Sequence, residues 1–353
     1  MNYQQIIESI QKDVKEFPKK VLRASEVLAG NPDYRVAKTP ADVVYSEDKM
    51  KLLHYHRRVK KKKIHQTPVL IVYALINRYI MLDLEPGRSF IQNLLNEGLD
   101  VYLIDWGYPT GADRYLGLDD YINHYMDTAV ESIRFETKTQ KINLMSVCMG
   151  GTFSVIYAAL HSKKVKNLIT LATPTQFDID DAGLFLWARG FDVDKALDGL
   201  GNLPGDLANI LYLLVSPVAT ATKYIQFLEG IEDPKFVSTF LRMEKWIFDS
   251  PDMAGEVFRE WIRDFMQRNL LIQNRLIIDG RKVDLRKIKC PLLNVFGKND
   301  YLAPPSAAKP LSGAVGSKDV TTIGVDTGHV GIFVGSKSYK TISPKIAKWI
   351  RER

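Results

Sequence analysis

Three side chains that together can perform covalent acyl transfer occur along the chain in the order cysteine, aspartate, histidine. Cys148, Asp300 and His329 each follow a short apolar segment. A thiolate is a far better nucleophile than a thiol, so a catalytic cysteine needs a base, and the base needs an acid that orients it. We therefore interpret Cys148 as a nucleophile, His329 as its base and Asp300 as the acid.

The residues around Cys148 have the pattern of a sharp turn between a strand and a helix. Their sequence is Leu144-Met145-Ser146-Val147-Cys148-Met149-Gly150-Gly151. α/β-Hydrolases hold their nucleophile in such a turn with the motif G-x-S-x-G, because small residues permit a strained backbone and close passage of strand and helix. Ser146 replaces the first glycine and Cys148 replaces the serine, while Gly150 is retained. Taken alone, the segment is also compatible with a buried structural cysteine.

Asp300 and His329 each follow a predicted strand, which is where an α/β-hydrolase carries its acid and its base. Asp300 follows a predicted strand over residues 292–296, and His329 follows another over residues 320–325. Open α/β sheets bind ligands beyond the carboxyl ends of their strands, and α/β-hydrolases have the chain order nucleophile, acid, base. Asp326 is a rival acid, but it is too near His329 in the sequence to be the usual orienting group.

An oxyanion hole needs two backbone N–H donors. Met149, directly after the nucleophile, is the candidate for the first. The second is expected from the loop after the first parallel strand, Ala74-Leu75-Ile76-Asn77-Arg78. Within this loop we favour Leu75, with Ile76 as the alternative. The last two residues of the loop are expected to fix it, and their contact with a substrate is left open.

The elements that would position these residues follow from the alternation of apolar and amphipathic segments. Short apolar runs are typical of strands that are buried on both faces. Predicted strands cover residues 69–73, 101–104, 142–145, 168–171, 292–296 and 320–325, and predicted helices cover residues 89–96, 118–133, 150–160 and 343–350. This order predicts the α/β-hydrolase fold, a mostly parallel doubly wound sheet with helices on both faces. A β-hairpin over residues 43–56 precedes it.

The alternation stops after Pro174 and returns after residue 285. The residues between carry helical patterns, and an Asp279-Gly280 turn indicates a small hairpin near their end. We therefore predict an N-terminal helical segment (1–40), an α/β-hydrolase core (41–177 and 286–353) and an inserted helical cap subdomain (178–285). In the N-terminal segment, apolar residues at helical spacing predict a helix that ends at Pro18.

Composition restricts the class of protein. The 353 residues are 46% hydrophobic and 25% charged, as in globular proteins. There is no run of 18 apolar residues and no signal-peptide pattern, so we expect a cytoplasmic protein without a membrane span. Two cysteines and six scattered histidines predict neither a disulfide framework nor a metal site.

The net charge of +7 has one local source. It equals 48 basic minus 41 acidic residues, and Arg57-Arg58-Val59-Lys60-Lys61-Lys62-Lys63 contains six of the basic ones. We interpret this run as a solvated loop between two strands. Because it lacks interleaved aromatic residues and any known motif, a nucleic-acid partner is not expected.

Six segments together resemble the polyhydroxyalkanoate synthases, in particular the short catalytic subunit of the two-component types (class III, less so class IV). The resemblance covers about residues 40–353 and leaves the N-terminal 35 or so residues unmatched. The segments are Tyr73-Ala74-Leu75-Ile76-Asn77-Arg78, Tyr102-Leu103-Ile104-Asp105-Trp106-Gly107, Leu118-Asp119-Asp120-Tyr121, Cys148-Met149-Gly150-Gly151, Arg242-Met243-Glu244-Lys245-Trp246 and Gly328-His329-Val330-Gly331.

The resemblance implies a substrate, a mechanism and partners. The substrate would be (R)-3-hydroxyacyl-CoA, mainly 3-hydroxybutyryl-CoA, whose acyl group moves onto Cys148 with release of CoA and without a cofactor. His329 would activate Cys148, and Asp300 would orient His329 or help deprotonate the 3-hydroxyl group. The family also implies a homodimer, an accessory subunit (E-type or R-type) and a place on the cytoplasmic polymer granule. Ser146 departs from the glycine that the family usually has there.

Two other functions are compatible with the same residues. One is a cysteine-dependent thioesterase or polyester hydrolase of the same fold, which would yield free acid where a synthase yields polymer and CoA. The other is a granule-binding protein without catalytic activity. The complete set of Cys148, Asp300 and His329 argues against the latter.

Overall fold

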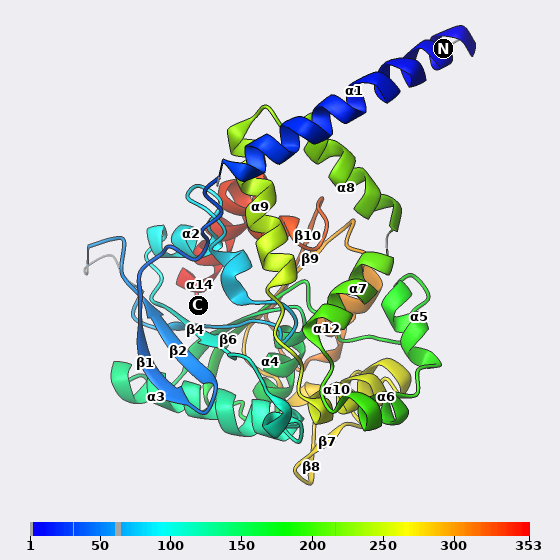
Figure 1. Cartoon of the computed structure of the whole chain (residues 1–353). Helices are drawn as coiled ribbons and strands as arrows, with labels where there is room; N and C mark the ends of the chain where they lie inside the picture. The colour runs from blue at the N-terminus through cyan, green and yellow to red at the C-terminus, as the bar shows by residue number, and fades with distance from the viewer. Residues whose placement is uncertain (1–2, 31, 61–64, 216) are drawn as a thin grey trace.

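One eight-stranded sheet forms the centre of the molecule in the computed structural model, which describes residues 3–30, 32–60, 65–215 and 217–353 (Figure 1). Its spatial order is β1-β2-β4-β3-β5-β6-β9-β10. The strands are β1 (Ala41–Glu47), β2 (Met50–Tyr55), β3 (Val69–Val72), β4 (Val101–Asp105), β5 (Ile142–Val147), β6 (Val165–Leu171), β9 (Leu292–Gly297) and β10 (Val320–Val325). A separate two-stranded hairpin consists of β7 (Ile277–Ile278) and β8 (Arg281–Lys282).

The helices fall into three groups along the chain. Before residue 178 lie α1 (Tyr3–Ala29), η2 (Tyr79–Leu82), α2 (Phe90–Asn96), η3 (Gly111–Asp113), η4 (Asp120–Met126), α3 (Asp127–Thr137) and α4 (Met149–Leu160). The next group is α5 (Gly183–Arg189), α6 (Val193–Leu200), α7 (Gly205–Val215), α8 (Pro217–Glu229), α9 (Pro234–Phe248), α10 (Gly255–Glu260) and η5 (Trp261–Gln267). The last group is η6 (Leu285–Lys287), α11 (Pro305–Ala308), α12 (Leu311–Ala314), α13 (Gly331–Val334), η7 (Ser338–Ile342) and α14 (Ser343–Arg351).

The sheet is parallel from β4 to β10 and begins with an antiparallel hairpin. β3, β5, β6 and β9 each pair in parallel with their neighbours, whereas β2 runs antiparallel to both β1 and β4. The parallel strands therefore end at one edge, where the loops that follow β3, β5, β9 and β10 meet. This is the α/β-hydrolase fold that the strand and helix order predicts.

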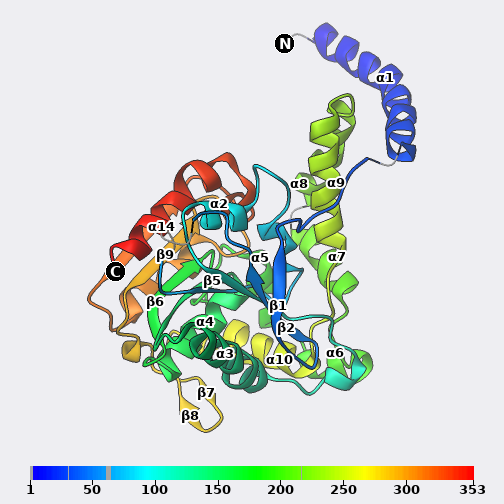
Figure 2. The same ribbon diagram turned by 90° about the vertical axis from the view of Figure 1, so that its left-hand side faces the viewer.

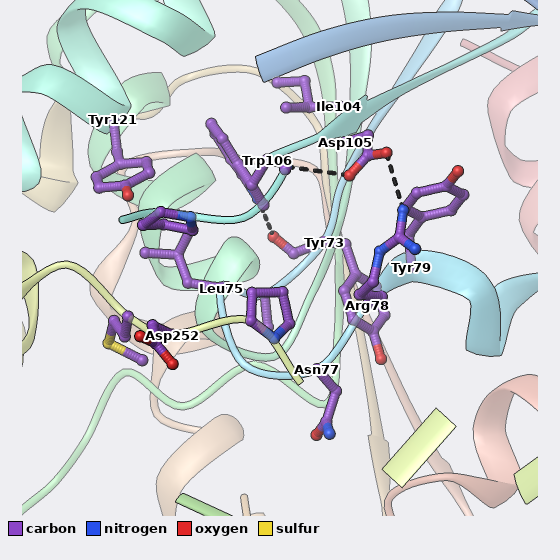
Figure 3. A pocket seen from close by; sticks show the side chains of 15 residues that line it. Tyr73, Leu75, Asn77, Arg78, Tyr79, Ile104, Asp105, Trp106, Tyr121 and Asp252 are labelled. Atoms are coloured by element: carbon purple, nitrogen blue, oxygen red, sulfur yellow. Dashed lines mark hydrogen bonds and ion pairs between the residues drawn. The ribbon is translucent and has the colours of Figure 1, made fainter. Parts of the chain in front are cut away.

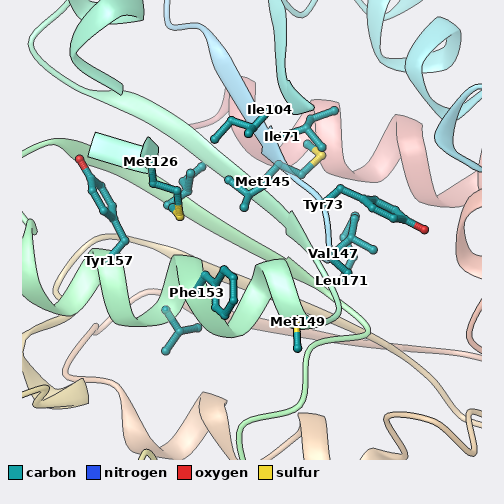
Figure 4. Packing of buried hydrophobic residues seen from close by; sticks show 14 of the residues in the cluster. Ile71, Tyr73, Ile104, Met126, Met145, Val147, Met149, Phe153, Tyr157 and Leu171 are labelled. Atoms are coloured by element: carbon teal, nitrogen blue, oxygen red, sulfur yellow. The ribbon is translucent and has the colours of Figure 1, made fainter. Parts of the chain in front are cut away.

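Helices cover both faces of the sheet. In Figure 2, α2 and α14 lie on one side of the strands, and α3 and α4 lie on the other. α2 is capped by Ser89, the residue before it, whose hydroxyl accepts the N–H of Gln92. α4 is buried along almost its whole length, from Met149 to Ala159. Figure 4 shows apolar side chains packed together between α4 and the neighbouring strands, among them Met149, Phe153 and Val147.

The segment between β6 and β9 is helical, as predicted, and a large part of it shares the core of the sheet. The ring of Trp261 lies 5.4 Å from that of Phe177 and 6.3 Å from that of Phe153, centroid to centroid. By contrast, α8 and α9 form a small separate cluster with the end of α1, in which Ala24, Phe227, Ile231 and Val237 are buried. The rest of α1 extends away from the body of the molecule (Figures 1 and 2).

One predicted helix boundary is wrong. α1 does not end at Pro18 but continues to Ala29, with the proline inside it. The final helix begins at Ser343, where it is predicted to begin, and η7 runs directly into it. Within the described residues, no helix is long and apolar enough to cross a membrane. The basic run begins in the loop between β2 and β3, while Lys61, Lys62 and Lys63 lie outside the described residues.

Candidate active site

Cys148 stands at a strained turn between β5 and α4. Its backbone angles are φ 51° and ψ −123°, a conformation that non-glycine residues rarely adopt. Its N–H donates to the carbonyl of Leu171 at 3.0 Å, which ties the turn to the next strand. The thiol is partly exposed. The turn thus presents the sulfur at the carboxyl edge of the sheet, as a nucleophile elbow does.

The small residues around the turn are required by close contacts with neighbouring backbone and side-chain atoms. A Cβ on Gly150 would lie 2.4 Å from the carbonyl oxygen of Tyr73, and one on Gly151 would lie 1.8 Å from the hydroxyl of Thr173. Ser146 is fully buried, and its hydroxyl donates to the carbonyl of Ile169 at 3.1 Å. The substitution of serine for glycine is therefore accommodated by one hydrogen bond, and the strained backbone of Cys148 is retained.

His329 and Asp300 are hydrogen-bonded to each other. Nδ1 of His329 lies 2.7 Å from Oδ2 of Asp300, whose side chain is completely buried. The other carboxylate oxygen, Oδ1, accepts the N–H groups of Leu302 at 2.9 Å and Ala303 at 3.0 Å. These bonds hold the carboxylate in one orientation. The bond at Nδ1 leaves Nε2 of the imidazole for Cys148.

The rival acid, Asp326, has other partners. Its carboxylate accepts from Asn299 at 3.0 Å and lies 3.3 Å from Nζ of Lys337, on the exposed side of the loop. Of the two aspartates, the one that bonds to His329 is Asp300.

Electrostatics favours a charged imidazole in this site. Burial by itself lowers the pKa of His329, but the charges of Cys148 and Asp300 and hydrogen bonds to both side chains raise it well above the ordinary value. The second cysteine, Cys290, is in the opposite situation, because burial raises the pKa of its thiol to about 11. Cys148 therefore has a protonated imidazole beside its sulfur, of the kind that activates thiols, whereas at Cys290 the effect of burial exceeds that of the nearby charge of Lys141.

A cavity of about 270 Å³ lies over Cys148 and His329. Its walls come from the loops of the sheet and from the helices of residues 178–285. Most lining residues are apolar or aromatic, including Tyr212, Trp246 and Trp261, and the polar ones include Asn77, Asn209, Thr220 and Lys223. Such a cavity suits an acyl chain with few polar groups.

The candidate oxyanion donors are the N–H of Met149 and that of Leu75 or Ile76. Met149 is the first residue of α4, so its N–H has no partner within that helix. Among the described residues, no hydrogen bond takes the N–H of Leu75 or Ile76. Ile76 lines the cavity over Cys148 and His329, whereas Leu75 lines a smaller one (Figure 3). The choice between these two donors stays a prediction.

The walls supplied by the inserted helices were not predicted from the sequence. Tyr212 belongs to an apolar stretch, and the sequence alone does not show whether such a stretch lies on the surface or lines a cavity. Lys223 has no motif around it. Trp246 is the exception, because it ends one of the six segments that carry the family resemblance. The described residues contain no group of three or more His, Cys, Asp or Glu side chains that could hold a metal ion.

Two family models match the chain. One describes the alpha/beta hydrolase fold and matches residues 67–336. The other describes the N-terminus of poly-beta-hydroxybutyrate polymerase (PhaC) and matches residues 4–94. The second match corrects the expectation that the N-terminal 35 or so residues lie outside the resemblance, because it includes most of α1.

Relatives of similar length have the same printed name. The chain is 44% identical to the poly(3-hydroxyalkanoate) polymerase subunit PhaC of Allochromatium vinosum over 347 residues, which is 98% of each chain. It is 41% identical to the subunit of that name from Synechocystis sp. over 350 residues, covering 96% of this chain and 92% of the other.

Solved structures are similar in fold alone. A putative lipase from Sulfolobus solfataricus has a TM-score of 0.58 at 15% identity, covering 90% of this chain and 98% of its own. A monoacylglycerol lipase from Paleococcus ferrophilus has a TM-score of 0.52 at 19% identity, covering 81% and 96%.

Proposed function

The chain belongs to the poly(3-hydroxyalkanoate) polymerase PhaC family, and from this membership we propose that it polymerises (R)-3-hydroxyacyl-CoA, mainly 3-hydroxybutyryl-CoA, with release of CoA. One observation supports this chemistry more than any other. Cys148 stands at an elbow turn and interacts with His329, and His329 bonds to the buried Asp300.

The first step would be acylation of Cys148. The sulfur of Cys148 attacks the thioester carbonyl of the substrate, and a new carbon–sulfur bond forms while the carbonyl oxygen becomes an oxyanion. The N–H of Met149 and that of Leu75 or Ile76 would donate to this oxyanion. Collapse of the intermediate breaks the bond to the sulfur of CoA, which takes the proton of His329 and leaves as the thiol.

The second step would be ester formation. The 3-hydroxyl oxygen of one acyl unit attacks the thioester carbonyl of another, so a carbon–oxygen bond forms and a carbon–sulfur bond breaks. His329 accepts the hydroxyl proton, and the sulfur leaves as a thiolate. The buried position of Asp300 and its bond to Nδ1 support an orienting role, whereas direct help in deprotonating the hydroxyl is the alternative.

The nucleophile and the apolar lining of the cavity favour a polymerase over a hydrolase. A thiolate exchanges readily between thioesters, because nucleophile and leaving group are matched thiols. A largely apolar cavity beneath helices limits competition by water. A cysteine-dependent thioesterase or polyester hydrolase of the same fold would have to admit water to the acyl-enzyme.

The product distinguishes these functions. The purified protein is incubated with 3-hydroxybutyryl-CoA, released CoA is followed with a thiol reagent, and recovered polymer is weighed against free 3-hydroxybutyrate. We expect CoA release with polymer as the main product. CoA release with free acid as the main product would favour the hydrolase, and no CoA release would favour a granule-binding protein without activity.

We also propose that residues 178–285 act as a movable cap, with hinges near Pro174 and Leu285. Polymer has to leave the cavity, and these helices form much of its wall. Limited proteolysis should cut the cap less when a non-hydrolysable substrate analogue is bound. Equal cleavage with and without the analogue would argue for a rigid cap.

Association with an accessory subunit is proposed from exposed apolar side chains. Val14 and Phe17 on α1 are exposed, and so are Ile210 and Leu214 on α7. Exposed apolar surface of this kind commonly marks an interaction site. We propose a class III two-component enzyme (class IV is less favoured) that forms a homodimer, binds an E-type or R-type subunit and resides on cytoplasmic polymer granules. Full activity of the isolated chain, without a lag and unchanged by the second subunit, would contradict the two-component proposal.

A further inference from the structure

Arg78 joins parts of the molecule that are far apart in the sequence. Its Nη2 donates to Oδ2 of Asp105 at 3.1 Å, and its Nη1 lies 3.7 Å from Oδ2 of Asp249. Asp105 ends β4, and Asp249 follows the last residue of α9. The guanidinium also lies over two rings, with its Cζ 5.4 Å from the ring centroid of Tyr79 and 5.0 Å from that of Tyr108. A single side chain thus links the central sheet to an inserted helix.

The backbone beside Arg78 is bound to the same end of α9. The carbonyl of Arg78 accepts Nε1–H of Trp246 at 2.9 Å. Nδ2 of Asn77 donates to the carbonyl of Ile247 at 3.1 Å and to the hydroxyl of Ser250 at 2.5 Å. Asn77 has φ +57°, a left-handed conformation that these bonds help to stabilise. Because Asn77 and Trp246 both line the catalytic cavity, this network forms part of its wall.

The chemistry of the contacts is specific for arginine. The side chain of Arg78 is mostly buried, and the two carboxylates it faces are largely buried as well. Tyr108 adds a hydrogen bond from its hydroxyl to Oδ1 of Asp249 at 2.5 Å. A planar guanidinium can face two carboxylates and stack on aromatic rings at the same time, which the point charge of a lysine cannot. Figure 3 shows the guanidinium directed at Asp105, while Asn77 points away from it.

We propose that Arg78 is a positioning residue for acyl transfer: its contacts with Asp105 and Asp249 fix residues 74–78, which carry the second oxyanion donor, against α9. This inference rests on the proposed function. Arg78 itself does not line the catalytic cavity and so acts through its neighbours. An N–H donor that is displaced from the oxyanion by about 1 Å can lower the rate by roughly 100-fold.

The test compares two reactions of Cys148. CoA release from 3-hydroxybutyryl-CoA passes through an oxyanion, whereas alkylation of Cys148 by iodoacetamide does not. For Arg78→Gln we expect kcat for CoA release to fall by roughly 10-fold to 100-fold, with KM and the alkylation rate changed less than about threefold. Arg78→Lys should recover only part of kcat. Asp249→Asn should lower kcat less than Arg78→Gln, and the double variant should resemble Arg78→Gln alone.

A control variant shows whether the loss of kcat is specific to Arg78, and different results would contradict the role of Arg78 and the proposed function. Arg134 on α3 is also a largely buried arginine, bonded to the carbonyl of Gln140, so Arg134→Gln should leave kcat unchanged. A kcat in Arg78→Gln within twofold of the wild type would overturn the inference while the proposed function stands. Equal losses of kcat and alkylation rate would overturn it too, since they would indicate a general structural effect. A wild-type protein that releases no CoA would contradict the proposed function itself.

Discussion

Nδ1 of His329 lies 2.7 Å from Oδ2 of Asp300, in loops that follow the adjacent parallel strands β10 and β9. Two backbone N–H groups hold the other oxygen of the carboxylate. The imidazole is thereby fixed with Nε2 available to Cys148, which stands after β5 at the same edge of the sheet. The pairing of strands thus brings together three residues that are distant in the sequence.

Substitution of Cys148 should abolish activity. Cys148→Ala removes the atom that would form the acyl-enzyme, and loss of a triad nucleophile costs roughly 10⁶-fold in a well-studied protease. Cys148→Ser should be nearly inactive, because a hydroxyl is far harder to deprotonate. CoA release from 3-hydroxybutyryl-CoA measures the effect. More than a tenth of the wild-type rate in Cys148→Ala would place the nucleophile elsewhere.

The matched control is Cys290→Ala. Cys290 precedes β9 at the end of the sheet that is remote from the site, and it is partly buried. Its replacement should leave CoA release close to the wild-type rate.

Alkylation should distinguish the two cysteines at neutral pH. The raised pKa of His329 means that the imidazole stays protonated at pH 7 and loses its charge only as the pH rises through that higher value. Its positive charge faces the sulfur of Cys148, and it is the thiolate that reacts. Iodoacetamide should therefore modify Cys148 much faster than Cys290, whose pKa is about 11.

His329→Ala tests the cause of this difference. Without the cationic partner, alkylation of Cys148 at pH 7 should slow by roughly 10-fold or more, while that of Cys290 should stay unchanged. Unchanged reactivity of Cys148 would mean that His329 does not activate it.

The strands and the elbow could be predicted because short stretches of consecutive residues determine them. β3, β5 and β9 are short and mostly apolar, and Cys148 stands between β5 and two glycines. Asp300 and His329 could be assigned because each follows a predicted strand, and parallel strands end at one edge.

The contacts made by the inserted helices could not be predicted in this way. The bond from Asn77 to Ser250 spans 173 residues, and no local pattern pairs these two side chains. Pro18 was misread because a proline removes one hydrogen bond and normally ends a helix. Here the helix continues past it, and beyond the proline Ala24 packs in the cluster with Phe227 of α8.

The close approach at the elbow predicts a strong effect of one added methyl group. In Gly150→Ala, the new Cβ would lie 2.4 Å from the carbonyl of Tyr73 and 2.5 Å from that of Val72, and backbone atoms cannot move aside easily. We expect a loss of about 1–3 kcal/mol in the free energy of unfolding, together with loss of CoA release.

Gly199→Ala is the control for this substitution. Gly199 lies in α6 with no atom near the position of a Cβ, so alanine should stabilise the protein by about 0.4–1 kcal/mol. Urea denaturation measures both variants. A Gly150→Ala variant as stable as the wild type would contradict the packing at the elbow.

Glu260 should make stability fall as the pH rises. Burial, helped by Glu256 and Asp264, raises the pKa of Glu260 to about 7, although its carboxylate accepts the N–H of Leu118 at 2.5 Å. The folded state therefore binds this proton more tightly than the unfolded state. The contribution of Glu260 to the free energy of unfolding is complete below about pH 4.5 and is lost as the pH rises through about 7.

Glu260→Gln removes this titration and keeps an oxygen for the N–H of Leu118. The variant should exceed the wild type in free energy of unfolding by about 1–2 kcal/mol at pH 8, with little difference at pH 5. The midpoints of urea denaturation at pH 5 and pH 8 measure this difference in stability. An advantage that is the same at both pH values would show that Glu260 does not titrate in this range.

Detection of the acyl-enzyme is the direct test of covalent catalysis by Cys148. The protein is mixed with 3-hydroxybutyryl-CoA, quenched in acid at early times and digested, and the peptide that contains Cys148 is examined by mass spectrometry. We expect one or more 3-hydroxybutyryl units on Cys148, removable by hydroxylamine, and none on Cys290. An unmodified Cys148 during active CoA release, or an acyl group that persists in Cys148→Ala, would contradict covalent catalysis by Cys148.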